Sequence, residues 1–96
     1  MITPKQRAEL RKTAQNIEPV MQVGKEGLSL NVINTADQAL YARELIKITV
    51  LESCENDVRD IANEMAERCK ADIVQVIGRK IVLYKKNLDK KIRSKK

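Results

Sequence analysis

The residues with the clearest chemical potential form the short segment Gly24-Lys25-Glu26-Gly27, which lies just before Ser29. Glycine reaches positive φ angles and lets another molecule approach the backbone closely, because it has no Cβ atom. If a helix begins after Ser29, free backbone N–H groups, the positive helix end and the Lys25 ammonium group can all meet one phosphate. The segment therefore predicts a site that grips the backbone of a polyanion.

The same segment also has a purely conformational interpretation, because a turn from a strand into a helix needs glycine for its geometry alone. The Glu26 carboxylate counts against phosphate binding, since it repels the ligand unless it points to solvent. The spacing matches neither a Walker A loop nor the GxGxxG fingerprint, so ATP and NAD are disfavoured as ligands. It does match the GxxG loop with which KH domains clamp nucleotides.

The chain has few of the residue types that enzymes and metal sites usually need. The chain has no histidine, the usual proton-transferring group of enzymes, and Cys54 has no candidate base. Two cysteines without histidine cannot supply the four ligands of a structural zinc site, so we expect Cys54 and Cys69 to be free thiols. We expect a protein that is not an enzyme and that has no metal and no cofactor.

Size and charge narrow the class of partner. The chain has 96 residues, of which 43% are hydrophobic and 33% charged, as expected for one soluble domain. Its net charge is +6, which attracts polyanions. Seven acidic residues crowd between Glu52 and Asp72, whereas basic residues dominate the first segment and everything after Gly78. Solubility alone does not require such segregation, so one surface should attract a polyanion and another should repel it.

The aromatic content predicts how a nucleic acid would be recognised. Phe and Trp are absent, and Tyr41 and Tyr84 are the only aromatic residues. Domains that stack successive bases need a platform of aromatic side chains, which this chain cannot build. We therefore expect recognition of the backbone and of shape.

Three helices are predicted to position these residues. Thr3-Pro4-Lys5-Gln6 is typical of an N-cap followed by proline at the first helical position, and this helix should run to about Asn16. A second helix should begin at the N-cap Ser29 and end near Arg43, and a third should extend from about residue 56 to residue 70.

Four strands complete the expected fold. The run 19–23 is a short strand, and Ile46, Ile48 and Val50 alternate with polar residues as in a half-buried strand. The segment 72–86 reads as two strands joined at Gly78-Arg79. The fold class is therefore α/β (α+β), a single domain of order α-β-α-β-α-β-β with a mixed four-stranded sheet and three helices.

The ends of the chain lead to two further expectations. Residues 87–96 should form a mobile basic tail that follows a domain over residues 1–86. No apolar run approaches the roughly 20 residues that span a bilayer, and the first residues lack the apolar stretch of a signal peptide. We expect a cytoplasmic protein without a membrane partner.

Three segments, "PVMQVGKEGLS", "ELIKITVLE" and "VQVIGRKIVLYKK", resemble the CRM domain in their order and spacing, and especially its small stand-alone bacterial members of the YhbY type. The resemblance covers about residues 2 to 86. It implies an RNA-binding domain with a fold similar to the C-terminal domain of a bacterial translation initiation factor, and an association with precursors of the large ribosomal subunit. The family pattern has glycine where this chain has Ala71, so the resemblance does not predict the conformation of the turn after the third helix.

We therefore expect a monomeric RNA-binding protein that associates with ribosomal RNA in large-subunit precursors and assists their assembly. A DNA-binding module and a protein-interaction adaptor with a basic patch remain as alternatives. The resemblance places the RNA-binding loop on Gly24, Lys25, Glu26 and Gly27. The wider electrostatic footprint is predicted to comprise Arg7, Arg11, Lys12, Lys47, Lys85 and Lys86.

Overall fold

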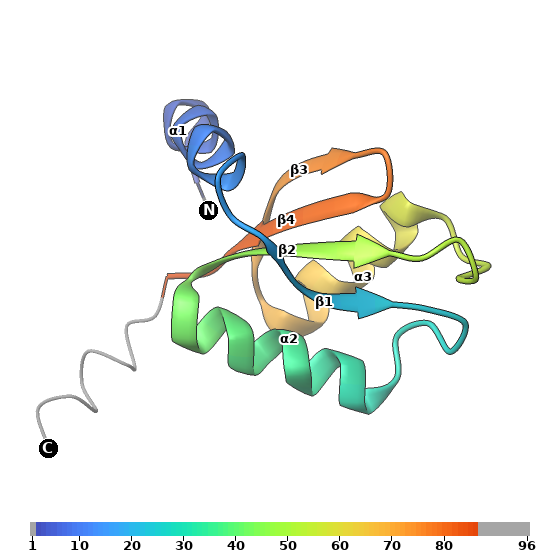
Figure 1. Ribbon diagram of the computed structural model, residues 1–96. Helices are drawn as coiled ribbons and strands as arrows, with labels where there is room; N and C mark the ends of the chain where they lie inside the picture. The colour runs from blue at the N-terminus through green and yellow to red at the C-terminus, as the bar shows by residue number, and fades with distance from the viewer. Residues whose placement is uncertain (1, 87–96) are drawn as a thin grey trace, which may run out of the picture.

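The computed structural model describes residues 2–86, so the predicted tail 87–96 lies outside the described residues. Its element order confirms the predicted α-β-α-β-α-β-β sequence of three helices and four strands (Figure 1). The elements are α1 Pro4–Ala14, β1 Pro19–Val23, α2 Leu30–Arg43, β2 Leu45–Val50, α3 Val58–Cys69, β3 Asp72–Ile77 and β4 Lys80–Tyr84.

The sheet is mixed, as predicted, with the strand order β1-β2-β4-β3. β1 runs parallel to β2, while β4 runs antiparallel to both β2 and β3. The carboxyl ends of β1 and β2 therefore meet at the same end of the sheet as the β3–β4 turn, on the right in Figure 1. We call this the loop end, and it holds the loops 24–29, 51–57 and 78–79.

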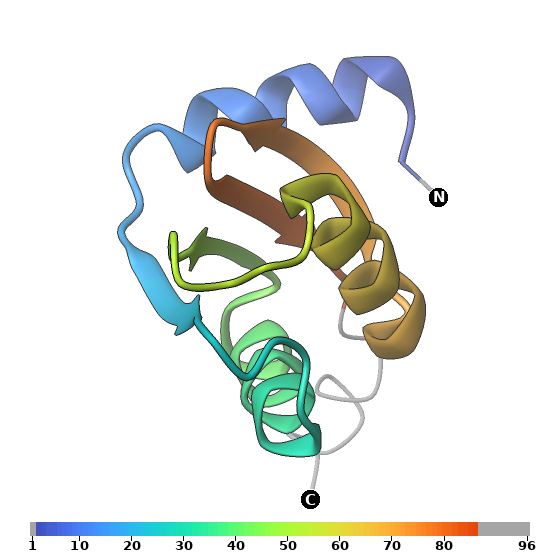
Figure 2. The same ribbon diagram turned by 90° about the vertical axis from the view of Figure 1, so that its right-hand side faces the viewer.

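Helices cover both faces of the sheet. Figure 2 shows α1 on one face and both α2 and α3 on the other. The alternation predicted for β2 is confirmed: Ile46, Ile48 and Val50 are fully buried toward α2 and α3, while Leu45 packs in the smaller cluster beneath α1. Successive side chains of a strand point to opposite faces, so Lys47 and Thr49 share the α1 side.

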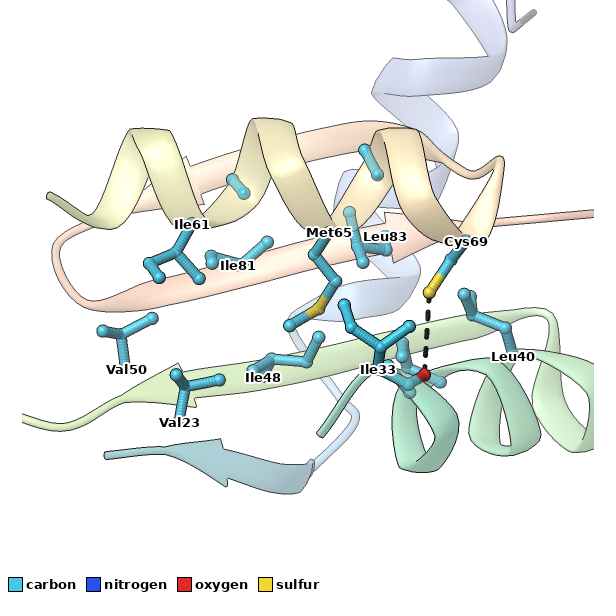
Figure 3. Packing of buried hydrophobic residues seen from close by; sticks show 14 of the residues in the cluster. Val23, Ile33, Leu40, Ile48, Val50, Ile61, Met65, Cys69, Ile81 and Leu83 are labelled. Atoms are coloured by element: carbon cyan, nitrogen blue, oxygen red, sulfur yellow. Dashed lines mark hydrogen bonds between the residues drawn. The ribbon is translucent and has the colours of Figure 1, made fainter. Parts of the chain in front are cut away.

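The main core lies between the sheet and the helices α2 and α3 (Figure 3). It is aliphatic and combines residues from both layers, such as Leu40 from α2, Met65 from α3 and Ile48 from the sheet. The Cys69 Sγ lies 3.9 Å from the carbonyl oxygen of Ile33, and burial raises the pKa of the Cys69 thiol. A smaller cluster of Ile2, Ala14, Val74 and Val82 holds α1 on the opposite face.

Side-chain caps begin each helix. The Thr3 Oγ1 accepts from the Gln6 N–H at 3.1 Å, and the Gln6 side chain accepts from the Thr3 N–H at 3.0 Å, which confirms the predicted capping box. Ser29 caps α2 as predicted. The third helix starts later than predicted, because Asp57 is the N-cap and accepts from the Arg59 N–H at 2.8 Å.

The predicted ends of α1 and α3 were too late. α1 ends at Ala14, so Ile17 follows the helix, although it still packs against the α1-side cluster. α3 ends at Cys69, and Lys70 takes the left-handed conformation with φ 57° and ψ 44°. The Ala71 N–H then donates to the Ala66 carbonyl oxygen at 2.8 Å, as in a Schellman motif. Lys70 supplies the positive φ of this turn, so no glycine is needed at Ala71.

The substitution Ile48→Ala should test the main core. Ile48 is fully buried on the central strand β2, so its truncation removes apolar contacts and leaves a cavity. The free energy of unfolding in urea should fall by about 2 to 5 kcal/mol. Thr49→Ala, at the next and half-buried position on the other face, serves as the control and should change stability far less. Equal losses for the two variants would contradict the assignment of the core to the α2/α3 face.

Candidate nucleic-acid interface

The GKEG loop, residues 24–27, is a closed turn at the loop end. The Gly27 N–H donates to the Gly24 carbonyl oxygen at 2.9 Å, so Lys25 and Glu26 occupy the two central positions, where both are exposed. Gly27 has φ +66°, a conformation that side chains with a Cβ rarely adopt. Gly24 lies close to the loop 51–57, because a Cβ there would lie 3.4 Å from the Leu51 Cδ1, at ordinary van der Waals contact.

The turn leads directly into the N-terminus of α2. Ser29 accepts from the Val32 N–H at 3.2 Å through its Oγ, which satisfies one donor of the first helical turn. Within residues 2–86, the N–H groups of Lys25, Glu26, Leu30 and Asn31 have no hydrogen-bond acceptor. Unpaired N–H groups at a helix N-terminus attract anions, because they carry the positive end of the helix dipole. The loop thus presents donors that a phosphate can use.

The Lys25 ammonium group is available for an anion. The ion pairs found among the described residues join Arg68 to Glu64 and Lys85 to Asp37, and neither involves Lys25. An exposed lysine without a carboxylate partner keeps its full charge for a ligand. Lys25 therefore adds a mobile positive charge to the fixed N–H groups of the loop.

Arg79, in the β3–β4 turn, fixes the loop end. Its Nε donates to the Val50 carbonyl oxygen at 2.7 Å, and its Nη2 donates to the Leu51 carbonyl oxygen. The Leu51 N–H in turn donates to the Val23 carbonyl oxygen at 2.8 Å, and the Leu51 side chain packs against Gly24. A chain of contacts thus runs from Arg79 through Leu51 to the GKEG loop. The sequence predicts Arg79 only as a turn residue, and nothing local in the sequence indicates these long-range bonds.

Carboxylates border the GKEG loop on one side. The neighbouring loop 51–57 carries the exposed residues Glu52, Glu55 and Asp57, and the Asn56 Oδ1 lies 3.5 Å from where a Cβ of Gly27 would be. These carboxylates and Glu26 weaken the attraction of a distant polyanion to the loop end. An anion bound here must therefore depend on short-range contacts with Lys25 and the N–H groups.

The predicted basic residues of α1 lie on the other face of the sheet. Arg11 and Lys12 are exposed in the last turn of α1, where positive charge also favours the helix dipole. Arg7 is partly buried, and its Nε has no hydrogen-bond partner within the described residues. Lys47 shares this face of the sheet and is half-buried. The structure brings these four side chains to the α1 side and leaves the GKEG loop at the loop end.

Lys85 and Lys86 lie far from the GKEG loop, because they follow β4 at the end of the sheet opposite to the loop end. The Lys85 Nζ lies 3.6 Å from the Asp37 Oδ1, and the Lys85 backbone N–H donates to the Glu44 carbonyl oxygen at 2.8 Å. Lys85 therefore contributes less free positive charge than the sequence suggested.

The described part of the chain contains no candidate metal site and no candidate membrane-spanning helix. Across residues 2–86, no three His, Cys, Asp or Glu side chains gather where they could hold a metal ion. Among the helices that the structure describes, none is long and apolar enough to cross a membrane.

Comparison with known proteins gives a consistent match. The family model described as the CRS1/YhbY (CRM) domain matches residues 2–85. The chain is 44% identical over 91 residues to the Probable RNA-binding protein YqeI from Bacillus subtilis, and the match covers 95% of each chain. It is 33% identical to a protein from Haemophilus influenzae named RNA-binding protein, over 95% of this chain and 92% of that one.

A solved structure has the same fold. The solution structure of the protein SAV1595 from Staphylococcus aureus superimposes with a TM-score of 0.78 at 42% sequence identity. The match covers 90% of each chain. Both the strand order and the placement of the loops at one end of the sheet therefore belong to a known structural type.

The substitution Arg79→Ala should lower the free energy of unfolding by about 1 to 3 kcal/mol, because the carbonyl groups of Val50 and Leu51 lose their charged donor. Arg79→Lys should recover only part of the loss, since an ammonium group cannot reproduce the planar fork. Urea unfolding of the two variants measures both effects. Wild-type stability of Arg79→Ala would contradict the structural role of these hydrogen bonds.

Proposed function

This chain belongs to the CRS1/YhbY (CRM) domain family, and we propose that it binds RNA through the GKEG loop. The observation that carries the proposal is the conjunction at this loop of an unpaired Lys25, free backbone N–H groups and the start of α2. The names of the relatives from Bacillus subtilis and Haemophilus influenzae, both RNA-binding proteins, support the choice of RNA over other polyanions.

In the proposed mechanism each part of the loop has one role. The positive φ of Gly27 turns the chain from the loop toward α2, while Gly24 lies beside Leu51. Lys25 pairs with a phosphate as a point charge, while the N–H groups of the loop and of the first helical turn donate to its oxygens. A phosphate can bind here only with the Glu26 carboxylate turned toward solvent, because the carboxylate would otherwise repel it.

Recognition then depends on the RNA backbone and its shape. Tyr84 is half-buried against the α1-side cluster, which suits a packing role better than base stacking. Without a row of aromatic side chains the protein cannot stack successive bases. The exposed Arg11 and Lys12, the partly buried Arg7 and the half-buried Lys47 would extend the electrostatic footprint on the α1 side.

We further propose that the RNA is ribosomal RNA in precursors of the large ribosomal subunit, whose assembly the protein assists as a monomer in the cytoplasm. The family resemblance and the basic net charge support this assignment. A small domain with one phosphate-binding loop binds weakly alone, so components of the particle would supply additional affinity through multivalent contact. Sedimentation of cell extracts tests the assignment: the protein should migrate with large-subunit precursors and shift to the top of the gradient after ribonuclease treatment.

The substitution Lys25→Ala should weaken binding to a single-stranded RNA oligonucleotide by about tenfold, the equivalent of one charge-assisted contact. The thermal unfolding midpoint should not change, because Lys25 is exposed and makes no ion pair with a described residue. Lys70→Asn is the matched control, since it removes one charge at the end of α3 and asparagine tolerates the left-handed conformation of residue 70.

Two outcomes would contradict this part of the proposal. Equal affinities of Lys25→Ala and the wild type, with equal melting temperatures, would exclude the GKEG loop from RNA binding. Loss of the RNA complex in the presence of excess duplex DNA would indicate a DNA-binding module, because contacts to the ribose 2′-hydroxyl distinguish RNA from DNA.

The substitution Glu26→Gln should raise RNA affinity severalfold at low salt, because it removes a carboxylate beside the proposed phosphate site. The gain should shrink as the ionic strength rises, since salt screens charges on the surface. Glu67→Gln, which removes the same charge from the exposed acidic face of α3, is the control and should have a smaller effect. Equal gains for both variants would mean that only net charge matters.

A further inference from the structure

Part of the α1-side face of the sheet is left open next to the loop end. The strand register places two rows of side chains across all four strands on this face. The row nearer the loop end contains Gln22, Thr49, Lys80 and Ile77, and the next row contains Pro19, Lys47, Val82 and Gln75.

α1 covers only part of this face. Ala14, at the end of α1, is buried against Val82 and the rest of the smaller cluster. Beyond it, Lys80 is exposed and Ile77 keeps 60% of its surface accessible. A groove of about 240 Å³ lies between the end of α1 and the sheet, lined among others by Gln15, Lys47 and Gln75.

The groove concentrates uncompensated positive charge. Lys47 pairs with Val82, and Lys80 precedes Val82 by two residues, so the two lysines occupy diagonal positions about 7 to 8 Å apart. Like charges this close on neighbouring strands repel each other. Neither lysine is ion-paired with a described residue, and no carboxylate lines the groove. An anion between the two ammonium groups would relieve the repulsion.

The groove and the proposed phosphate site both lie toward the loop end, on different strands of the sheet. Gln22 is two residues before Gly24, and Lys80 follows Arg79, whose guanidinium group fixes the loop end. Around the two lysines the face offers amide, hydroxyl and apolar side chains, which suit ribose and base edges of a nucleotide chain. An acidic protein partner would need no such neutral hydrogen-bonding groups.

We propose that Lys47 and Lys80 bind a second phosphate of the same RNA strand whose first phosphate is held by the GKEG loop. An unpaired strand then crosses the open sheet face from the loop end toward α1. This inference rests on the proposed RNA-binding function, and it adds Lys80 and the groove to the interface. It also restricts the substrate to single-stranded segments, because a strand paired in a duplex cannot lie in a groove of this size.

The salt dependence of binding to a 12-nucleotide single-stranded RNA tests the inference. Log affinity falls linearly with log salt concentration, and each lost phosphate contact makes this fall shallower by about 0.7 in slope. Lys80→Gln and Lys47→Gln should each show this decrease together with a severalfold weaker affinity, at an unchanged melting temperature. Lys70→Asn on the far side should leave the slope unchanged. A slope for Lys80→Gln equal to that of Lys70→Asn would overturn the inference.

Amide chemical-shift changes on addition of the same RNA separate this inference from the proposed function. Shifts at both Lys25 and the row of Gln22, Thr49, Lys80 and Ile77 support the groove. Shifts confined to the GKEG loop overturn the groove and leave the proposed function intact, whereas shifts at neither surface overturn both. Addition of inorganic phosphate alone should shift the same row weakly; an absence of shifts even at high phosphate concentration would count against an anion site.

Discussion

The parallel pairing of β1 with β2 determines where the GKEG loop and α2 lie. Two parallel neighbours require a crossover connection, which here is α2, so the chain leaving β1 must turn at once into a helix. That turn is the GKEG loop. The same pairing sets the loop beside the end of β2, where the fork of hydrogen bonds from Arg79 holds the Leu51 backbone against it. The geometry of the proposed phosphate site thus follows from the sheet topology.

Much of this arrangement could be predicted from the sequence, because it is encoded locally. The capping box at Thr3, the cap at Ser29 and the alternation of Ile46, Ile48 and Val50 each depend on residues within one element. The helix ends were less predictable, since the left-handed conformation of Lys70 has no residue signature comparable to glycine. The exposed position of Lys80 could have been predicted from the sequence. Side chains alternate along β4, so Lys80 points to the face of the sheet opposite to that of the buried Ile81.

Contacts between distant elements could not be predicted. Arg79 binds carbonyl groups 28 and 29 residues away in the sequence, and no local pattern indicates its partners. The sequence likewise predicts Lys85 as an unpaired basic residue, whereas its ammonium group lies beside the Asp37 carboxylate in the structure. The sequence therefore gives the number of basic residues but not where their side chains lie in the folded protein. In the folded protein the predicted basic residues divide between the loop end, with Lys25, the α1 side of the sheet, and the opposite end of the sheet, with Lys85 and Lys86.

The proposed function depends on one property, the binding of RNA inside the cell. Ultraviolet crosslinking of the tagged protein in growing cells, followed by sequencing of the retained RNA fragments, tests it most directly. If the protein binds RNA as proposed, crosslinks should concentrate at one or two places in the large-subunit ribosomal RNA. A yield of crosslinked RNA no higher than that of an untagged control would mean that the protein does not bind RNA in the cell, and the glycines of the GKEG loop would then serve only to turn the chain from β1 into α2.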